Sequence, residues 1–321
     1  MNYSTVLAAS IGAAVLIHLP QAAAQAYPSK YIRVITTYSG GAETIARLIG
    51  NKMAERMGQP FVIEATTGAN GSIGALTVAK AAPDGYTLLA STGATQIIRG
   101  FLVKDVPYDP FRDFTPITHA FDAVGVVATH PGGLSSLRDM IEFGKRFPGK
   151  LSYGTTGLGS AYHMAAEQIQ QLTGAQFLHV PYKAGTQSIT DLVAARVDTA
   201  IMVIASSRPF AESGKLRFLA TLNSNRFAAF PDLPTVAEVV PGFRPVPLWG
   251  GYFGPAKLPE NLVQRLHGEF ANAIRQPDVT AQMERAGLML VVAGPGAFAA
   301  TIKDDVEQLR RLVKTVGILP E

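Results

Sequence analysis

The feature that most constrains the fold is a regular alternation of short β-rich runs with longer segments of helical periodicity. Such alternation is typical of parallel strands joined by crossover helices, so we predict an α/β fold. In the last segment, apolar residues recur every three or four positions from Phe298 to Val313 and predict one buried face. The predicted strands are 32–36, 61–64, 86–90, 124–129, 151–154, 177–180, 199–204, 216–222 and 249–253; the predicted helices are 43–57, 72–81, 137–147, 161–172, 187–195, 260–275 and 296–316.

The length of the chain and one irregular stretch predict two domains. With 321 residues, 47% of them hydrophobic and 16% charged, the chain can form two α/β cores. Prolines interrupt residues 223–248, which are therefore predicted to be a long ordered loop or linker. Strands at 121–129 and 248–253 would then cross between the domains. We expect residues 27–122 and 250–321 to form domain 1, and residues 123–249 to form an inserted domain 2.

Residues 1–26 have the pattern of an export signal. The apolar run at 6–19 is too short to span a bilayer, and Ala24, Gln25 and Ala26 fit the small-x-small cleavage rule. No Lys or Arg precedes the run, which leaves a helix retained in the mature protein as the alternative. We expect a soluble exported protein that begins near Tyr27, after cleavage at Ala26.

Charge and cysteine content exclude several functions. The net charge of +4 comes from 28 basic and 24 acidic residues without a basic cluster, so we expect no nucleic-acid partner. The chain has no cysteine, which excludes disulfides, thiolate catalysis and Cys metal sites. The six histidines form no close pair along the sequence, so we expect no metal site and no cofactor.

Small polar residues follow five of the predicted strands, where an anion could bind. The clearest example lies within Arg33–Arg47, where a strand runs into Ser39, Gly40 and Gly41 and a helix begins at once. Free backbone N–H groups and the helix dipole give such a turn partial positive charge. A single loop of this kind is ordinary helix capping, but five together favour a clamp for a small carboxylate.

The candidate ligand-binding residues are the small, hydroxyl or ionisable residues of these loops. For Lys183 the alternative is an ordinary surface lysine, and for His163 a packing or capping role. Trp249, at the predicted return crossing, either lines the cleft or packs in the hinge core. The candidates are Ser39, Gly40, Gly41, Thr44, Gly71, Ser91, Thr92, Thr155, Thr156, Gly157, Ser160, His163, Lys183, Gly185, Thr186 and Trp249, and Thr95 belongs to the third loop.

Enzyme and nucleotide templates fit the sequence poorly. Leu158 stands two positions before Ser160, so the Gly-x-Ser-x-Gly turn of esterases is absent. The glycines around Gly154 do not match a dinucleotide-binding pattern, and no P-loop occurs. Because no nucleophile, base and orienting group can be assigned together, we predict that the chain is not an enzyme. A hydrolase of small esters is the weaker alternative.

A series of short motifs extends along nearly all of residues 27–321. It includes Tyr-Pro-Ser-Lys at 27–30, Gly-Ala-Asn-Gly-Ser-Ile-Gly at 68–74 and His-Val-Pro-Tyr-Lys at 179–183. In the order and spacing of these motifs, the chain resembles the solute-binding receptors of tripartite tricarboxylate transporters, the Bug-type family. The other matching segments are 40–41, 46–48, 82–86, 108–114, 148–153, 214–217, 231–236 and 249–259.

The resemblance implies a two-domain Venus flytrap of the type II periplasmic binding protein class, with a mixed sheet flanked by helices in each lobe. It also implies a carboxylate ligand held by the loops, partly through water, and handed to a two-component membrane permease. We accordingly expect a monomeric periplasmic receptor. A sensory receptor that presents its ligand to a membrane kinase is the alternative.

Three departures from the family pattern concern the ligand. Tyr38 lies in the segment that replaces the usual Pro-Phe-Pro-Pro, and the next loop is one residue shorter, so the usual Asp is lost or replaced by Glu43. Met202 and Val203 stand where the family often has Asp-Asn. We include Tyr38, Glu43 and Met202 among the candidate contacts. The loss of polar groups predicts a drier cleft that favours an aromatic or apolar-tailed acid over an amino acid.

Overall fold

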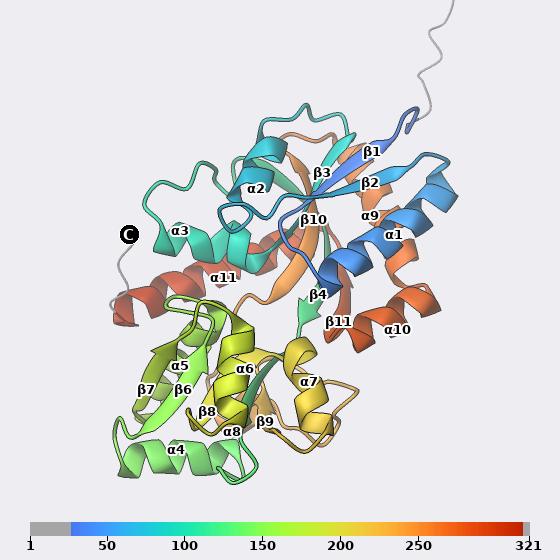
Figure 1. Cartoon of the computed structure of the whole chain (residues 1–321). Coiled ribbons are helices and arrows are strands. Elements are labelled where there is room, and N and C mark those ends of the chain that lie inside the picture. Colours follow the sequence, from blue (N-terminus) through green and yellow to red (C-terminus); the bar gives the residue numbers. More distant parts are fainter. Residues whose placement is uncertain (1–26, 317–321) are drawn as a thin grey trace, which may run out of the picture.

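Two mixed β-sheets, each flanked by helices, organise residues 27–316, the part of the chain that the computed structural model describes (Figure 1). The predicted export signal, residues 1–26, lies outside the described residues. The first sheet has the strand order β11-β4-β10-β3-β1-β2. Strands β1 to β3 are parallel, whereas β10 runs antiparallel to β3 and β4. Its strands are β1 Ile32–Thr36, β2 Phe61–Ala65, β3 Thr87–Thr92, β4 Phe114–Ala123, β10 Trp249–Pro255 and β11 Leu288–Ala293.

The second sheet has the order β7-β6-β8-β5-β9. Strand β6 runs parallel to β7 and β8, and β5 runs antiparallel to β8 and β9. We call the part of the chain built on the first sheet lobe 1 and the part built on the second sheet lobe 2. The strands of lobe 2 are β5 Gly125–Thr129, β6 Leu151–Thr155, β7 Phe177–Pro181, β8 Thr199–Val203 and β9 Arg217–Thr221.

The helices of lobe 1 bury one apolar face against its sheet. On α1, Ile45, Ile49 and Met53 are buried at helical spacing, and Gly50 allows a close approach to β2, since a Cβ there would lie 3.1 Å from Ile63 Cδ1. The helices are α1 Gly41–Met57, α2 Ser72–Ala79, the π-helical turn η1 Ala94–Ile98, α3 Arg99–Leu102, α9 Glu260–Ile274, α10 Pro277–Arg285 and α11 Pro295–Val316.

The helices of lobe 2 begin at recognisable caps. Ser136 accepts a hydrogen bond from the backbone N–H of Asp139, and Ser160 does the same for His163. Gly174, in the left-handed conformation, ends the second of these helices. The helices are α4 Leu137–Arg146, α5 Ala161–Thr173, α6 Gly185–Val193, α7 Ile204–Glu212 and α8 Val236–Val239.

Each predicted strand and helix is found, and the α/β prediction is confirmed. The predicted continuous strand at 121–129 is divided at Val124, where β4 ends in one sheet and β5 begins in the other. The prediction missed most of β4 and all of β11, in addition to η1, α3, α7, α8 and α10. Pro116, His119 and Asp122 interrupt the apolar pattern of β4, and only the pairing of that strand with β10 and β11 makes it regular.

The chain crosses between the lobes through a hydrogen-bonded segment, Ala123 to Gly125. The N–H of Val124 donates to Gly287 O in lobe 1 (2.9 Å), and its carbonyl accepts from Ile204 N in lobe 2 (2.8 Å). The side chain of Asn223 donates to Ala123 O (3.1 Å) and accepts from Gly125 N (3.3 Å). The two sheets are therefore joined through paired backbone groups rather than through a free linker.

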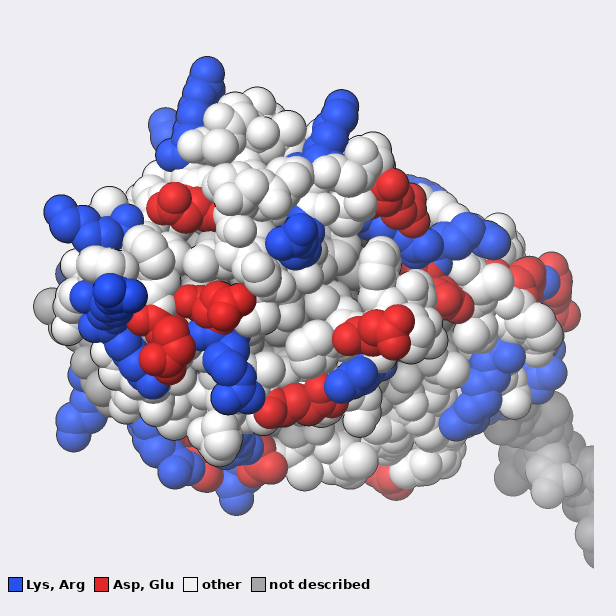
Figure 2. All heavy atoms as spheres, turned by 90° about the horizontal axis from the view of Figure 1, so that it is seen from below, with Lys and Arg blue, Asp and Glu red and all other residues white. Residues whose placement is uncertain are grey.

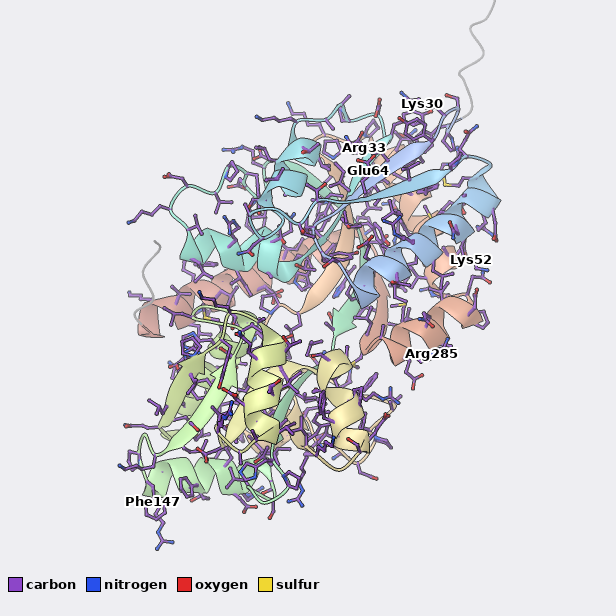
Figure 3. All side chains as sticks on the ribbon, viewed as in Figure 1. Lys30, Arg33, Lys52, Glu64, Phe147 and Arg285 are labelled. Atoms are coloured by element: carbon purple, nitrogen blue, oxygen red, sulfur yellow. The ribbon has the colours of Figure 1, made fainter. Side chains whose placement is uncertain are left out.

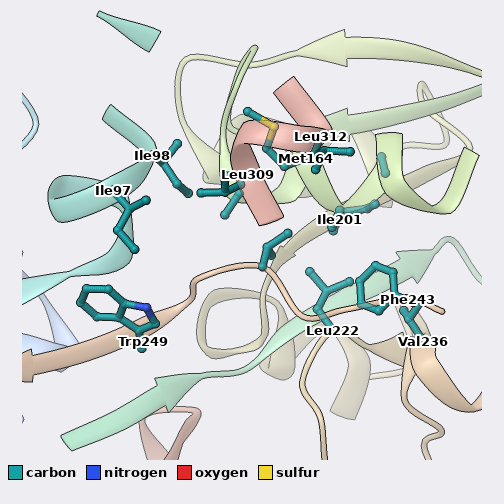
Figure 4. Close-up of a cluster of buried hydrophobic side chains, with 14 of the residues drawn as sticks. Ile97, Ile98, Met164, Ile201, Leu222, Val236, Phe243, Trp249, Leu309 and Leu312 are labelled. Carbon is teal, nitrogen blue, oxygen red and sulfur yellow. The ribbon is translucent and has the colours of Figure 1, made fainter. Parts of the chain in front are cut away.

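Helix α11 connects the apolar cores of the two lobes. It packs on β4 of lobe 1, where Phe298 stacks on His119, and on α5 of lobe 2. Figure 4 shows Leu309 and Leu312 of α11 beside Met164 of α5, and all three belong to one buried cluster that also contains Ile98 of lobe 1. The helix therefore contributes to the packing of both lobes and fixes their distance on one side.

Charged side chains lie outside these cores and mostly pair locally. Figure 3 shows Arg33 and Glu64 side by side on β1 and β2, with their closest N and O atoms 2.6 Å apart. Since both side chains are partly exposed, we expect this pair to contribute at most about 1 kcal/mol. On the face in Figure 2, basic and acidic residues are interspersed, and no field of one sign covers it.

We predict that Leu309→Ala destabilises the protein strongly. Leu309 is fully buried between the lobes, and removing a buried leucine side chain typically costs about 2–5 kcal/mol. Urea unfolding should show this loss, whereas Leu178→Ala, at a side chain 56% exposed, should change the free energy of unfolding by less than about 0.5 kcal/mol. Equal effects of the two substitutions would contradict the role of α11.

Candidate functional site: the cavity between the lobes

A cavity of about 700 Å³ lies between the two lobes. This volume is within the usual range for a small-molecule site. Lobe 1, lobe 2 and the crossing segments all contribute to its lining. The lining residues are Thr37, Tyr38, Ser39, Thr67, Asn70, Thr92, Ala94, Thr95, Ile98, Arg99, Leu102 and Val103 from lobe 1, Thr156, Leu158, Ser160, Ala161 and Tyr162 from lobe 2, and Ala123, Pro247 and Leu248 near the crossing.

On the lobe 1 side, hydroxyl groups form a connected cluster. Thr37 Oγ1 lies 3.1 Å from Ser91 Oγ, and Thr95 Oγ1 donates to Thr37 Oγ1 (3.3 Å) and to Asn70 O (3.2 Å). Gly71 allows these loops to meet: its φ is +85°, and a Cβ there would lie 2.5 Å from Thr37 Cβ. The cluster is thus fixed by packing before any ligand arrives.

The helices that begin at this cluster have no side-chain caps. Gly40 precedes α1 and Gly71 precedes α2, and neither helix start has a side-chain hydrogen bond to its N–H groups. At α2 the N–H groups of Ser72 and Ile73 donate to Ala69 O and Gly68 O, whereas the first N–H groups of α1 are available to an acceptor such as water or a carboxylate. Within the first turn of α1, Glu43 is bound to Arg47 (2.6 Å), so its carboxylate is already paired.

On the lobe 2 side, the loop between β6 and α5 is held from behind. The N–H of Gly159 donates to His163 Nδ1 (3.0 Å). Gly159 has a φ of +72°, and a Cβ on it would lie 2.3 Å from Leu102 Cδ2 of lobe 1. The glycine therefore permits Leu102 to touch lobe 2 at one edge of the cavity.

A stack of two histidines supports this loop. The rings of His163 and His179 are 4.2 Å apart, and Thr155 Oγ1 lies 2.7 Å from His179 Nε2. Burial, and secondarily the charge of His163, lowers the pKa of His179 to about 4. At neutral pH the imidazole of His179 is therefore uncharged and acts as a packing and hydrogen-bonding group.

Five of the residues predicted from the sequence line the cavity: Tyr38, Ser39, Thr92, Thr156 and Ser160. Burial, and secondarily the charge of Glu43, raises the pKa of Tyr38, whose phenol is therefore neutral at physiological pH. The residues that do not line the cavity are Gly40, Gly41, Glu43, Thr44, Gly71, Ser91, Thr155, Gly157, His163, Lys183, Gly185, Thr186, Met202 and Trp249.

Two of these residues are in the interior, away from the cavity. Met202 is 1% exposed and packs with Ile189 and Leu192 in the core of lobe 2. Trp249 is 2% exposed and donates its indole N–H to Asp305 Oδ2 of α11 (2.8 Å). It borders a smaller cavity of about 170 Å³ near the crossing, where burial raises the pKa of Asp305 to about 6.

The sequence analysis missed a helical stretch that faces the cavity. Lining residues recur in pairs every four positions along η1 and α3, and the prediction had assigned no structure there. The spacing could have indicated one face of a helix. The Gly93 that precedes η1 and the irregular turn concealed the pattern. The sequence analysis named Thr95 as part of the third loop, and the missed residues of these pairs are Ala94, Ile98, Arg99, Leu102 and Val103.

Within residues 27–316, no helix is both long enough and apolar enough to cross a membrane. In the same part of the chain, no three His, Asp or Glu residues come together in a group that could hold a metal ion. The cavity thus offers hydroxyl groups, backbone N–H groups, apolar side chains and one arginine.

Two α/β lobes with a polar-loop cavity between them define the class of periplasmic solute-binding proteins. The chain belongs to the family described as the tripartite tricarboxylate transporter family receptor, whose profile matches residues 45–318. It is 33% identical to the UPF0065 protein in the tcbD-tcbE intergenic region of Pseudomonas sp. (strain P51), over 90% of this chain and 87% of that protein. It is 31% identical to protein BugT of Bordetella pertussis, over 92% and 91% of the two chains.

Solved structures give the same assignment. An R. palustris protein with adipate has a TM-score of 0.78 and 28% identity, and the match covers 92% of this chain and all of that one. MatC from Rhodopseudomonas palustris with bound malate has a TM-score of 0.72 and 27% identity, over 89% of this chain and all of the other. The family and fold predictions are confirmed, and the family and structural neighbours are substrate-binding proteins rather than enzymes.

We predict that His179→Gln removes part of the pH dependence of stability. The pKa of His179 is about 4 in the folded protein and near 6.5 when unfolded, so its contribution is present above pH 6.5 and is lost as pH falls towards 4. Allowing for partial solvent screening, the loss is about 1–2 kcal/mol. Urea unfolding between pH 4 and 7.5 should show a flatter profile for the variant. Parallel profiles would contradict this assignment.

Proposed function

We propose that this chain is the periplasmic receptor of a tripartite tricarboxylate-type transporter and captures a small organic carboxylate between its lobes. The observation that carries the proposal is the cavity, which is lined by polar loops of both lobes and by hardly any charged residue. A ligand that bridges the lobes favours the closed arrangement by its higher affinity for that arrangement. We further propose that the protein acts as a monomer and delivers the ligand to membrane permease subunits.

The proposed carboxylate contacts come from both sides of the cavity. On lobe 1 they are the hydroxyl of Thr92 and the segment with Tyr38 and Ser39; on lobe 2 they are Thr156 and Ser160. In the described residues, the hydroxyls of Thr92 and Thr156 make no hydrogen bond within the protein. Free donors on opposite lobes are suited to a ligand that joins them.

The segment around the start of α6 is proposed to contact the ligand beside Thr156. Gly185 borders Thr156, since a Cβ on the glycine would lie 3.5 Å from Thr156 Cγ2. Lys183 lies in the exposed connection before α6, and Thr186 is an exposed residue of the first turn of α6. Lys183, Gly185 and Thr186 are therefore proposed to lie against a ligand held at Thr156 and to close on lobe 1 together with it.

The lining favours an aromatic or apolar-tailed acid over an amino acid. Ile98, Leu102, Val103, Leu158 and Leu248 give the cavity a largely apolar wall. No Asp or Glu is among the lining residues, so an ammonium group would lose its water without gaining a partner of opposite charge. The adipate and malate of the two R. palustris structures support a carboxylate ligand.

The same binding chemistry would serve a sensory receptor that presents its liganded state to a membrane kinase. The family match favours delivery to a transporter. Capture of the permease subunits by the liganded protein, with no capture by the ligand-free protein, is the result expected for the transport role.

We predict that a thermal-shift screen finds stabilisation by carboxylic acids with aromatic or aliphatic bodies and little or none by amino acids. A ligand at a hundred times its dissociation constant adds about 2.7 kcal/mol to the free energy of unfolding. The screen uses the mature protein after unfolding and refolding, which removes any ligand retained from the cell. Stabilisation by amino acids alone, or by no acid at all, would reject the proposed function.

We predict that Thr92→Val and Thr156→Val each weaken binding of the best acid from that screen by about five- to tenfold. Each change removes one hydroxyl donor, worth about 1 kcal/mol, with little change in shape. Calorimetry measures the affinity, and Thr77→Val, on the exposed face of α2, is the matched control. Because the two threonines belong to different lobes, a loss at only one of them would contradict binding across the cleft.

A further inference from the structure

Arg99 is the one charged residue among those that line the cavity between the lobes. It lies at the junction of η1 and α3, on the same face as Thr95 and Leu102. A lone guanidinium in a cavity with no acidic side chain makes that region positive. The proposed function accounts for one carboxylate, held by Tyr38, Ser39 and Thr92 of lobe 1 and by Thr156 and Ser160 of lobe 2, but leaves this charge unused.

The guanidinium of Arg99 has a buried N–H donor without a hydrogen-bond acceptor. Its Nε is buried and has no hydrogen-bond partner, and in the described residues Arg99 forms no ion pair. Other arginines are satisfied locally: Arg33 binds Glu64, and Arg226 binds Glu238 with several nitrogens. A buried N–H without an acceptor is costly, and in a native protein it calls for an explanation.

The backbone directs this side chain toward the cavity. Pairs of lining residues recur every four residues along η1 and α3. Because an α-helix has 3.6 residues per turn, each such step would rotate the next pair by about 40° around the helix axis. The wider π turn at Ala94–Ile98 reduces this drift and keeps Thr95 and Arg99 on one side. The phenol of Tyr108 donates to Thr95 O (2.6 Å) and helps to fix the turn.

The position of Arg99 relative to Thr92, a proposed carboxylate contact, sets the ligand length that it can serve. Thr95 follows Thr92 at the start of η1, and about one helical turn, ~5 Å along the axis, separates Thr95 from Arg99. Apolar side chains, among them Ile98 and Leu102, line the same region. An acid held at Thr92 and Thr156 would thus place an apolar body along this wall and its far end near the guanidinium.

We propose that the cavity selects a dicarboxylate with an apolar body, and that Arg99 binds its second carboxylate. This inference rests on the proposed function, because the first carboxylate occupies the contacts proposed there, on the loops of Thr92 and Thr156. A guanidinium matches a carboxylate with two parallel N–H···O bonds, which an ammonium or a neutral amide cannot reproduce. Arg99 is then the specificity-determining residue that distinguishes a diacid from a monoacid of equal length.

Calorimetry with matched pairs of acids tests this assignment. The pairs are the straight-chain diacids and monoacids of four to eight carbons, and benzene-1,4-dicarboxylate with 4-methylbenzoate. The proteins are the mature wild type, Arg99→Met, Arg99→Lys and the control Arg138→Met, which removes an exposed arginine of α4. We expect at least one diacid to bind the wild type about ten- to a hundredfold more tightly than its monoacid.

Arg99→Met should abolish that preference and leave the affinity for the monoacid unchanged or higher. Arg99→Lys should restore only part of it, and Arg138→Met should retain all of it. A wild type that binds monoacids as tightly as diacids, or a diacid preference that survives in Arg99→Met, would overturn the role of Arg99 while the receptor function stands. Failure of every acid to bind the folded wild type would instead reject the proposed function, and this inference with it.

Discussion

The cavity between the lobes depends on the pairing of backbone groups at Val124. Its N–H and carbonyl bind Gly287 in lobe 1 and Ile204 in lobe 2, so a single residue belongs to the hydrogen-bond systems of both lobes. The side-chain amide of Asn223 is hydrogen-bonded to the two neighbours of Val124: it donates to Ala123 O and accepts from Gly125 N. Because buried backbone groups are costly to leave unpaired, the two sheets cannot separate here without losing these bonds. The loops at the strand ends therefore face each other across a space of defined width.

Helix α11 adds a second connection at a distance from the crossing. Leu309 and Leu312 pack against lobe 2, while Phe298 packs in the core near β10. The hydrogen bond from Trp249 to Asp305 ties this helix to the start of β10. Rotation of one lobe against the other is thus restricted by a crossing point and by a packed helix.

The sequence was informative wherever structure is local. Strand β1 was predicted to its exact ends because Ile32–Thr36 is a short apolar run beside a glycine pair. Strand β4 was mostly missed because it becomes regular only through long-range pairing. For the site, loop chemistry identified Ser39, Thr92 and Thr156, which line the cavity, but it could not place Arg99, whose orientation depends on a π turn. Other residues of these loops have the same small or hydroxyl side chains but do not line the cavity. Only the folded structure distinguishes the lining residues from the others.

The contact between Leu102 and Gly159 shows which side of the cavity can change. The leucine of lobe 1 lies so close to this glycine that no Cβ would fit between them, and Gly93 is packed as closely against Pro247. The lobes already touch along this edge, so further closure has to rotate about it rather than translate across it. The proposed ligand, joining Thr92 to Thr156, would add attraction between the lobes to these contacts. The equilibrium between the open and closed arrangements then shifts by the difference in the ligand's affinity for the two. An acid that contacts only one lobe has equal affinity for both arrangements and cannot shift the equilibrium.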